Sequence, residues 1–185
     1  MLNKIKTDAS TRMTKSLEAL KHELTKLRTG RASSALVENL KVNVYGSDVP
    51  LSQCASISVT DARTLTITAW DKAAIAGIEK AIYSSDLGIT PNTAGTVIRI
   101  NLPPLTEDRR RDLAKHVQGE GENTKVAIRN VRRDAMQQVK ELLKAKSISE
   151  DEERRAEDEI QKLTDKFVKD VDAVVKHKQD ELMQI

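Results

Sequence analysis

Three arginines, Arg129, Arg132 and Arg133, lie within five positions of one another in a long helical stretch that has no aromatic residue. With 3.6 residues per turn, Lys125, Arg129 and Arg132 share one stripe of the helix, while a second stripe is apolar. A guanidinium group is planar, always charged and suited to phosphate. This row of cations on a rigid helix predicts a surface that binds a polyanion, and RNA is the first partner to consider.

The same pattern also has a purely structural explanation. Charged residues opposite an apolar stripe occur on any amphipathic helix at a protein surface, where water solvates them. The stripe alone therefore does not decide between a solvated face and a nucleic-acid interface.

Charge is unevenly distributed along the chain, although the net charge is only +3. Residues 1–30 carry seven basic against three acidic side chains, residues 104–148 carry eleven against seven, and residues 149–185 carry seven against twelve. If the three segments form one bundle, the acidic one neutralises its neighbours on one side and leaves a basic surface between the other two. This asymmetry favours the RNA interpretation.

The elements that must position these arginines are three long amphipathic helices. Apolar residues recur every three or four positions from Leu2, which predicts a first helix to about Arg28 with Gly30 as its C-terminal cap. A second helix should begin after Thr106, its N-cap, and run to about Lys146. Gly119 and Gly121 lie inside this second helix, where they favour a bend or a close helix contact.

The capping box Ser149–Glu152 predicts the start of a third helix, whose first turn is rich in acidic residues. Its apolar seam consists of Ala156, Ile160, Leu163, Phe167, Val171, Val174 and Leu182. Adjacent carboxylates at a helix start could also suggest a metal site, but they spread around the helix axis and no histidine is near in sequence. We interpret them as capping residues and expect no metal.

Residues 31–103 have a different composition, since three of the four prolines and three of the four aromatic residues of the chain lie there. Alternating apolar and polar residues predict short strands, and a helix is expected from Ala73 to Tyr83. The predicted strands are Val42–Val44, Ser56–Val59, Leu65–Ala69 and Ile98–Leu102.

The predicted fold is therefore α+β. Residues 1–30 and 105–185 form an elongated antiparallel three-helix bundle, and residues 31–104 form a small β/α/β domain inserted into it. Both connections are short and contain a helix breaker, which favours a hinge, although two short linkers could equally form a rigid elbow. The hinge residues would be Thr29, Gly30, Arg31, Pro103, Pro104 and Leu105.

Catalytic chemistry is not expected. His22, His116 and His177 lie on separate helices, and Cys54 is the only cysteine, so no nucleophile, base or metal set is gathered in sequence. We expect neither an enzyme nor a cofactor. No apolar run approaches the roughly 20 residues needed to span a bilayer, and the N-terminus lacks a secretory signal, so a cytoplasmic protein with no membrane partner is expected.

The chain resembles the bacterial ribosome recycling factor family over essentially its whole length. The matching segments are Lys26–Ser33, Tyr45–Gly46, Arg63–Leu65, Glu79–Ile82, Ser85–Gly88, Ile98–Ile100, Pro104–Glu107, Val126–Asp134 and Ile148–Glu152. Asp108, where the family usually has Glu, is a conservative difference.

The resemblance implies an L-shaped monomer with tRNA-like proportions and a role in translation. Together with elongation factor G and GTP hydrolysis, such a factor splits the post-termination ribosome into subunits. It binds ribosomal RNA of the large subunit through the helical bundle. Arg28, Arg129 and Arg132 match the family's RNA-contacting arginines, and Arg31 lies at the elbow among them.

One alternative from another class remains at this point. A coiled-coil adaptor or chaperone that binds protein partners would also explain the long helices. It predicts exposed apolar seams and no salt-sensitive RNA binding, whereas the arginine face predicts the reverse.

Overall fold

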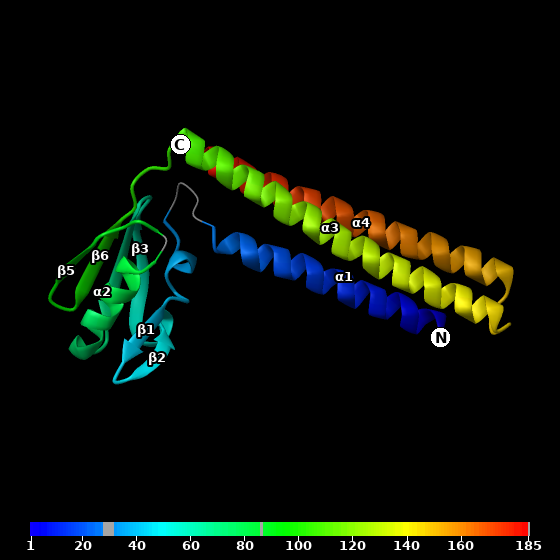
Figure 1. Cartoon of the computed structure of the whole chain (residues 1–185), viewed down its shortest axis with the longest axis horizontal. Coiled ribbons are helices and arrows are strands. Elements are labelled where there is room, and N and C mark those ends of the chain that lie inside the picture. The colour runs from blue at the N-terminus through cyan, green and yellow to red at the C-terminus, as the bar shows by residue number, and fades with distance from the viewer. Residues whose placement is uncertain (28–31, 86, 185) are drawn as a thin grey trace. The chain divides into compact units, whose positions relative to one another are not determined.

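A computed structural model of the chain describes residues 1–27, 32–85 and 87–184 (Figure 1). The chain divides into two compact units. The first comprises Met1–Leu24 and Arg111–Asp180, and the second comprises Thr25–Arg110 and Glu181–Ile185.

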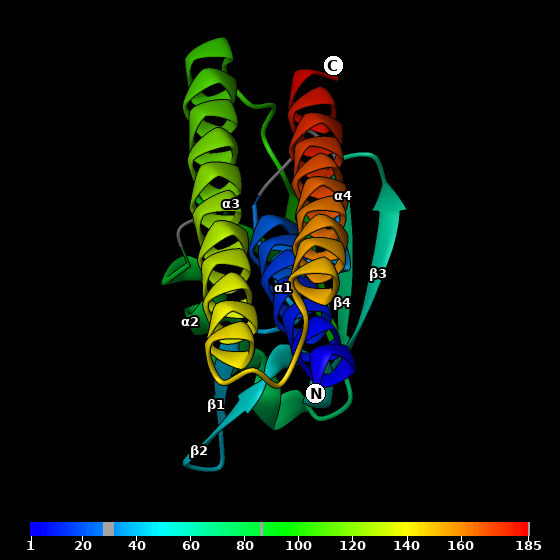
Figure 2. The same ribbon diagram turned by 90° about the vertical axis from the view of Figure 1, so that its right-hand side faces the viewer.

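The first unit is a bundle of the helices α1 (Leu2–Thr25), α3 (Glu107–Lys144) and α4 (Glu150–Met183), which lie side by side in Figures 1 and 2. Contacts between the helices give their directions. Arg12 of α1 pairs with Asp134 of α3, and a groove nearer the start of α1 is lined by residues nearer the end of α3, so these helices are antiparallel. By the same reasoning, α3 and α4 are antiparallel and α1 and α4 are parallel.

Apolar residues from all three helices form the core of the bundle. The predicted seam positions are buried or half-buried, and Met13, Ile128 and Ile160 are completely inaccessible to solvent. On α4, however, Val175 is buried and the predicted Val174 is only half-buried. Because the seams pack in the core, the described residues of the bundle present no exposed apolar stripe of the kind that the adaptor hypothesis requires.

The predicted start signals of α3 and α4 are confirmed. The Arg109 N–H donates to Thr106 Oγ1 at 3.2 Å. At the next helix, the Glu152 N–H donates to Ser149 Oγ at 3.2 Å, and the Ser149 N–H donates to the Glu152 carboxylate at 2.8 Å. This reciprocal pair satisfies backbone donors that a helix start otherwise leaves free.

The predicted ends of the helices were slightly too late. α1 ends at Thr25 instead of about Arg28, and the proposed cap Gly30 lies outside the described residues. α3 ends at Lys144, and Lys146 adopts a left-handed conformation with a φ of 59°, which stops the helix.

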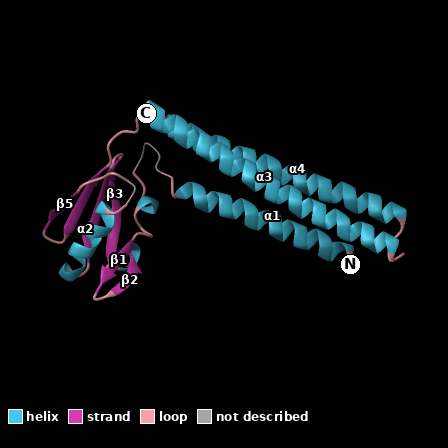
Figure 3. Ribbon diagram, viewed as in Figure 1, coloured by secondary structure: helices cyan, strands magenta, loops and turns pink. Residues whose placement is uncertain are grey.

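The described part of the second unit contains two antiparallel sheets, the α-helix α2 and short 3₁₀ turns (Figure 3). Strands β1 (Lys41–Val44) and β2 (Ser47–Pro50) form a hairpin. Strands β3 (Ala55–Asp61), β4 (Thr64–Ala69), β5 (Pro91–Ala94) and β6 (Val97–Asn101) form a sheet in the order β3-β4-β6-β5. Helix α2 spans Ile75–Tyr83.

The register of the central strands explains the core of this unit. Leu65 lies opposite Ile100, Ile67 lies opposite Ile98, and all four side chains are fully buried. They belong to one apolar cluster with Ile78 and Ile82 of α2. Alternation along each strand places one set of side chains in this core, as the sequence predicted for these two strands.

Two strands were not expected from the sequence. β2 contains an Asp and ends in Pro50, and β5 begins with Pro91 and carries Asn and Thr, so neither shows an apolar alternation. Each is an edge strand that pairs with one neighbour, where proline and polar residues are tolerated. In addition, the predicted helix at Ala73 begins with a 3₁₀ turn, and the α-helix starts at Ile75.

Candidate nucleic-acid interface

A ladder of polar contacts joins α3 to α4 along one edge of the bundle. Its α3 members are seven residues apart, a spacing that returns a side chain to the same helix face. From one end to the other, the contacts join Gln118 to Gln179, Lys125 to Asp172 and Arg132 to Gln161. Two of the predicted RNA-binding residues, Lys125 and Arg132, therefore contact α4.

Two carboxylates hold the ammonium group of Lys125. Its Nζ is ion-paired with Asp172 and lies 3.4 Å from the Glu122 carboxylate, and only 14% of the Lys125 side chain is exposed. The hydrogen bond to Asp172 is the main reason why the pKa of Lys125 is raised above 10.5. The lysine is charged, but its charge is neutralised within the bundle.

Arg132 is held by a neutral group instead. Its Nη1 donates to Gln161 Oε1 at 2.6 Å, and Gln161 Nε2 in turn donates to Asp165 Oδ1 at 2.9 Å. The Nε atom of Arg132 is buried and has no hydrogen-bond partner among the described residues. Arg132 as a whole residue is half-buried.

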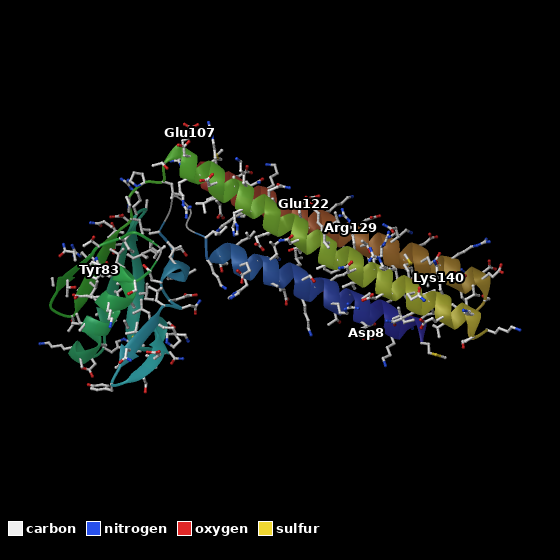
Figure 4. The ribbon with its side chains drawn as sticks, in the orientation of Figure 1. Asp8, Tyr83, Glu107, Glu122, Arg129 and Lys140 are labelled. Atoms are coloured by element: carbon white, nitrogen blue, oxygen red, sulfur yellow. The ribbon has the colours of Figure 1, made fainter. Side chains whose placement is uncertain are left out.

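Arg129 and Arg133 face solvent. Both are exposed, and neither has a hydrogen bond or ion pair with another residue of the described ranges. Exposed Lys140 and Lys144 continue the same helix face at spacings of seven and four residues. We call these four residues the outer basic row, and the labels of Arg129 and Lys140 mark two of its positions along α3 in Figure 4.

The structure thus divides the single stripe that the sequence predicted. Lys125 and Arg132 belong to the α3–α4 ladder, whereas Arg129 and Arg133 belong to the outer basic row. At the boundary between α1 and α3, Arg12 Nη2 donates to Asp134 Oδ2 at 2.9 Å, so one of the cations of α1 is paired with a carboxylate.

The remaining predicted site residues belong to the two predicted connections between bundle and inserted domain. Arg28 and Arg31, proposed to bind RNA, lie outside the described residues, as do the hinge residues Thr29 and Gly30. In the return connection, Pro103 and Pro104 are exposed, whereas Leu105 is buried.

The turn between β3 and β4 forms hydrogen bonds with both ends of the segment that carries the sheets, at Ala32 and at Leu102. The Ala32 N–H donates to the Ala62 carbonyl at 2.7 Å, and the Leu102 N–H donates to the Arg63 carbonyl at 2.7 Å. The turn itself is held by Asp61, whose carboxylate accepts the Arg63 N–H at 3.0 Å, and this bond lowers the Asp61 pKa. These two bonds hold Ala32 and Leu102 at the same turn.

Sequence reasoning missed the α4 side of the ladder. Gln161 and Asp172 are partners of the α3 cations and Asp165 accepts a hydrogen bond from Gln161, yet none of the three was predicted as a site residue. A signal was present, because Asp165 and Asp172 are seven residues apart, as are Lys125 and Arg132. Antiparallel helices bring two such repeats into register.

Other kinds of site find no support in the described ranges. No group of three or more His, Cys, Asp or Glu side chains there is arranged to hold a metal ion. Burial raises the pKa of the Cys54 thiol, which disfavours the reactive thiolate. No described helix has the combination of length and apolar character needed to cross a bilayer.

Comparison with known sequences gives a consistent result. Residues 20–183 match the family described as "Ribosome recycling factor". The ribosome-recycling factor of Xanthomonas campestris pv. campestris strain B100 is 65% identical over 185 residues, covering 100% of both chains. That of Xanthomonas euvesicatoria pv. vesicatoria strain 85-10 is 64% identical with the same coverage.

Two solved structures are also similar to the chain. A solution structure of the ribosome recycling factor superimposes with a TM-score of 0.80 and 43% identity, covering 100% of this chain and 98% of that one. The Thermus thermophilus factor, in models of that factor and Escherichia coli elongation factor G bound to the post-termination complex, gives a TM-score of 0.68 and 47% identity, with 100% coverage of both chains.

Proposed function

The chain belongs to the ribosome recycling factor family, and on this premise we propose that it splits the post-termination ribosome into subunits together with elongation factor G and GTP hydrolysis. Its partners are the ribosome and elongation factor G, as in the post-termination complex described for the Thermus thermophilus relative. It works in the cytoplasm, as a monomer and without a cofactor or catalytic residues of its own. The observation that carries the proposal is the full-length identity of 65% to ribosome-recycling factors.

The bundle provides the contact with ribosomal RNA of the large subunit. Arg129 and Arg133 of the outer basic row are unpaired among the described residues and can bind phosphates directly, while half-buried Arg132 keeps N–H donors beyond the one bonded to Gln161. The predicted set also contains Arg28, Arg31 and Lys125, of which Lys125 is already paired with carboxylates of the bundle. Such contacts fix orientation, and specificity comes from the fit of a rigid helical rod to the shape of the RNA.

A hinge between bundle (1–30 and 105–185) and inserted domain (31–104) transmits the motion. We place it at Thr29, Gly30 and Arg31 on one side and at Pro103, Pro104 and Leu105 on the other. Two backbone hydrogen bonds support this placement. Ala32 follows the first proposed hinge segment, Leu102 precedes the second, and both residues are bonded to the β3–β4 turn of the inserted domain. Elongation factor G would push the inserted domain while the bundle stays anchored, and the resulting strain breaks contacts between the subunits.

Light scattering of intact ribosomes tests the proposal. We expect scattering to fall when this protein, elongation factor G and GTP are all present, and to stay constant when either factor is omitted. If scattering stays constant with all three present, while a recycling factor of known activity lowers it, the proposed function is wrong.

A further inference from the structure

The two cationic rungs of the α3–α4 ladder are built differently. Lys125 contacts carboxylates directly, through Asp172 and Glu122. Arg132 occupies the equivalent position seven residues later, but the amide of Gln161 lies between its guanidinium and the Asp165 carboxylate. Lys125 is therefore paired with negative charge, whereas the acceptor that holds Arg132 is neutral and does not offset its charge.

We infer that Gln161 is a positioning residue for Arg132, which holds the guanidinium ready for an RNA phosphate and prevents Asp165 from neutralising it. This inference rests on the proposed function, in which Arg132 binds ribosomal RNA. Gln161 would touch no RNA itself and would act only through the arginine.

Hydrogen-bond chemistry supports this role. An amide has one acceptor oxygen and one donor NH₂ group, and Asp165 accepts from the NH₂ group at 2.9 Å, so the oxygen of Gln161 is directed at Arg132. The bond from Arg132 Nη1 to that oxygen is short, at 2.6 Å. Arginine has five N–H donors, and a single neutral acceptor leaves others available for phosphate.

A fixed arginine binds phosphate more tightly than a mobile one because less side-chain entropy is lost on binding. A carboxylate in place of the amide would fix the arginine as well, but it would compete with the phosphate for the same charge. The inference therefore predicts that a neutral hydrogen-bond acceptor at position 161 is better than either an apolar side chain or a carboxylate.

The test is binding of the full-length protein to purified large ribosomal subunits at two salt concentrations, with thermal unfolding of each variant followed by circular dichroism. Gln161→Met keeps the length of the side chain but not the acceptor, and we expect the Kd to rise about three- to tenfold, the range for one hydrogen bond. Gln161→Glu should weaken binding further and flatten the slope of log Kd against log salt by somewhat under one.

A double-mutant cycle with Arg132→Ala separates positioning from a general effect on the bundle. Arg132→Ala alone should weaken binding, and adding Gln161→Met should cause no further loss, because the residue it positions is already absent. Gln179→Ala is the matched control, since Gln179 also makes hydrogen bonds from α4 to α3, to the Ala114 carbonyl and to Gln118, without contacting an arginine. It should leave the affinity unchanged.

Each contrary result has a distinct meaning. Losses that add up in the double variant, or a Gln161→Glu variant that binds as tightly as the wild type, would overturn the positioning role. If Gln161→Met lowers the unfolding temperature and the affinity no more than Gln179→Ala does, Gln161 is only structural. If Arg132→Ala itself binds normally, the proposed RNA contact of Arg132 is wrong, and the positioning role is overturned with it.

Discussion

Gly121 of α3 lies so close to Val175 of α4 that a Cβ atom at the glycine would be 2.5 Å from Val175 Cγ2. Real Cβ atoms do not approach other atoms this closely. Gly121 therefore allows the two helices to come together at this point, and Val175 fills the space that a larger residue would occupy. Of the two roles that the sequence suggested for the glycines of α3, close helix contact is the correct one at Gly121.

Replacing Gly121 should therefore destabilise the bundle although alanine is the better helix former. We expect Gly121→Ala to cost about 1–3 kcal/mol, because β-branched Val175 has little freedom to move. Gly119→Ala is the matched control, since no atom lies within 4 Å of a Cβ there, and it should stabilise the protein by up to about 1 kcal/mol. Urea unfolding measures both, and equal effects would contradict the packing argument.

The outer basic row should carry salt-dependent binding without contributing to stability. The variant Arg129→Ala/Arg133→Ala should bind large ribosomal subunits more weakly and reduce the salt slope by somewhat under two. Its free energy of unfolding should change by no more than about 0.5 kcal/mol per site, because both side chains are exposed and unpaired within the described ranges. Filter binding at several salt concentrations provides the measurement.

A control for net charge is available on the acidic helix. Arg154→Ala/Arg155→Ala removes the same number of exposed arginines from the start of α4. If this variant loses as much affinity as the α3 variant, the effect is one of total charge, and the assignment of the outer basic row fails.

Lys125 should stabilise the folded protein at pH values where its ammonium group is charged, and it should contribute little to RNA binding. Its pKa is raised in the folded protein, chiefly by Asp172, so its stabilising contribution is fully present below about 10.5, the unfolded value, and is lost as the pH rises through the folded value. We expect the stability difference between wild type and Lys125→Met to shrink between about pH 9 and about pH 11.5. Urea unfolding at both pH values tests this, and a constant difference would argue against the ion pair.

The same variant checks the division of the arginine stripe. Because two carboxylates already neutralise Lys125, Lys125→Met should bind large subunits with nearly wild-type affinity and an unchanged salt slope. A loss comparable to that of Arg129→Ala would show that Lys125 leaves its carboxylates to bind RNA.

In the second unit, the phenol of Tyr45 donates to Asp71 Oδ2 at 2.7 Å. This hydrogen bond to a carboxylate raises the pKa of Tyr45 above its ordinary value of 10.0. We expect Asp71→Asn to lower the pKa of Tyr45, because the charge that opposes phenolate formation is removed. Ultraviolet titration, with Tyr45→Phe to identify the signal of this tyrosine, is the measurement, and an unchanged midpoint would exclude the contact in solution.

The long helices could be predicted from sequence because their signals are local. The spacing of Ala9, Met13 and Leu17 on α1 and the capping box at Ser149 both depend on residues a few positions apart, and the structure confirms them. The strands β4 and β6 were predicted for the same reason. β2 and β5 were not, because they exist through pairing with a neighbour and carry no apolar alternation of their own.

By itself, the sequence determined that arginines would gather on one helix of a three-helix bundle, because helix periodicity and capping are short-range properties of the chain. It did not determine which basic residues of that helix would contact α4 and which would face solvent. The antiparallel register of α3 and α4 decided that, since it places Asp172 at Lys125 and Gln161 at Arg132 and leaves Arg129 in solvent. Register depends on packing between residues dozens of positions apart, as at Gly121 and Val175, and only the tertiary structure contains that information.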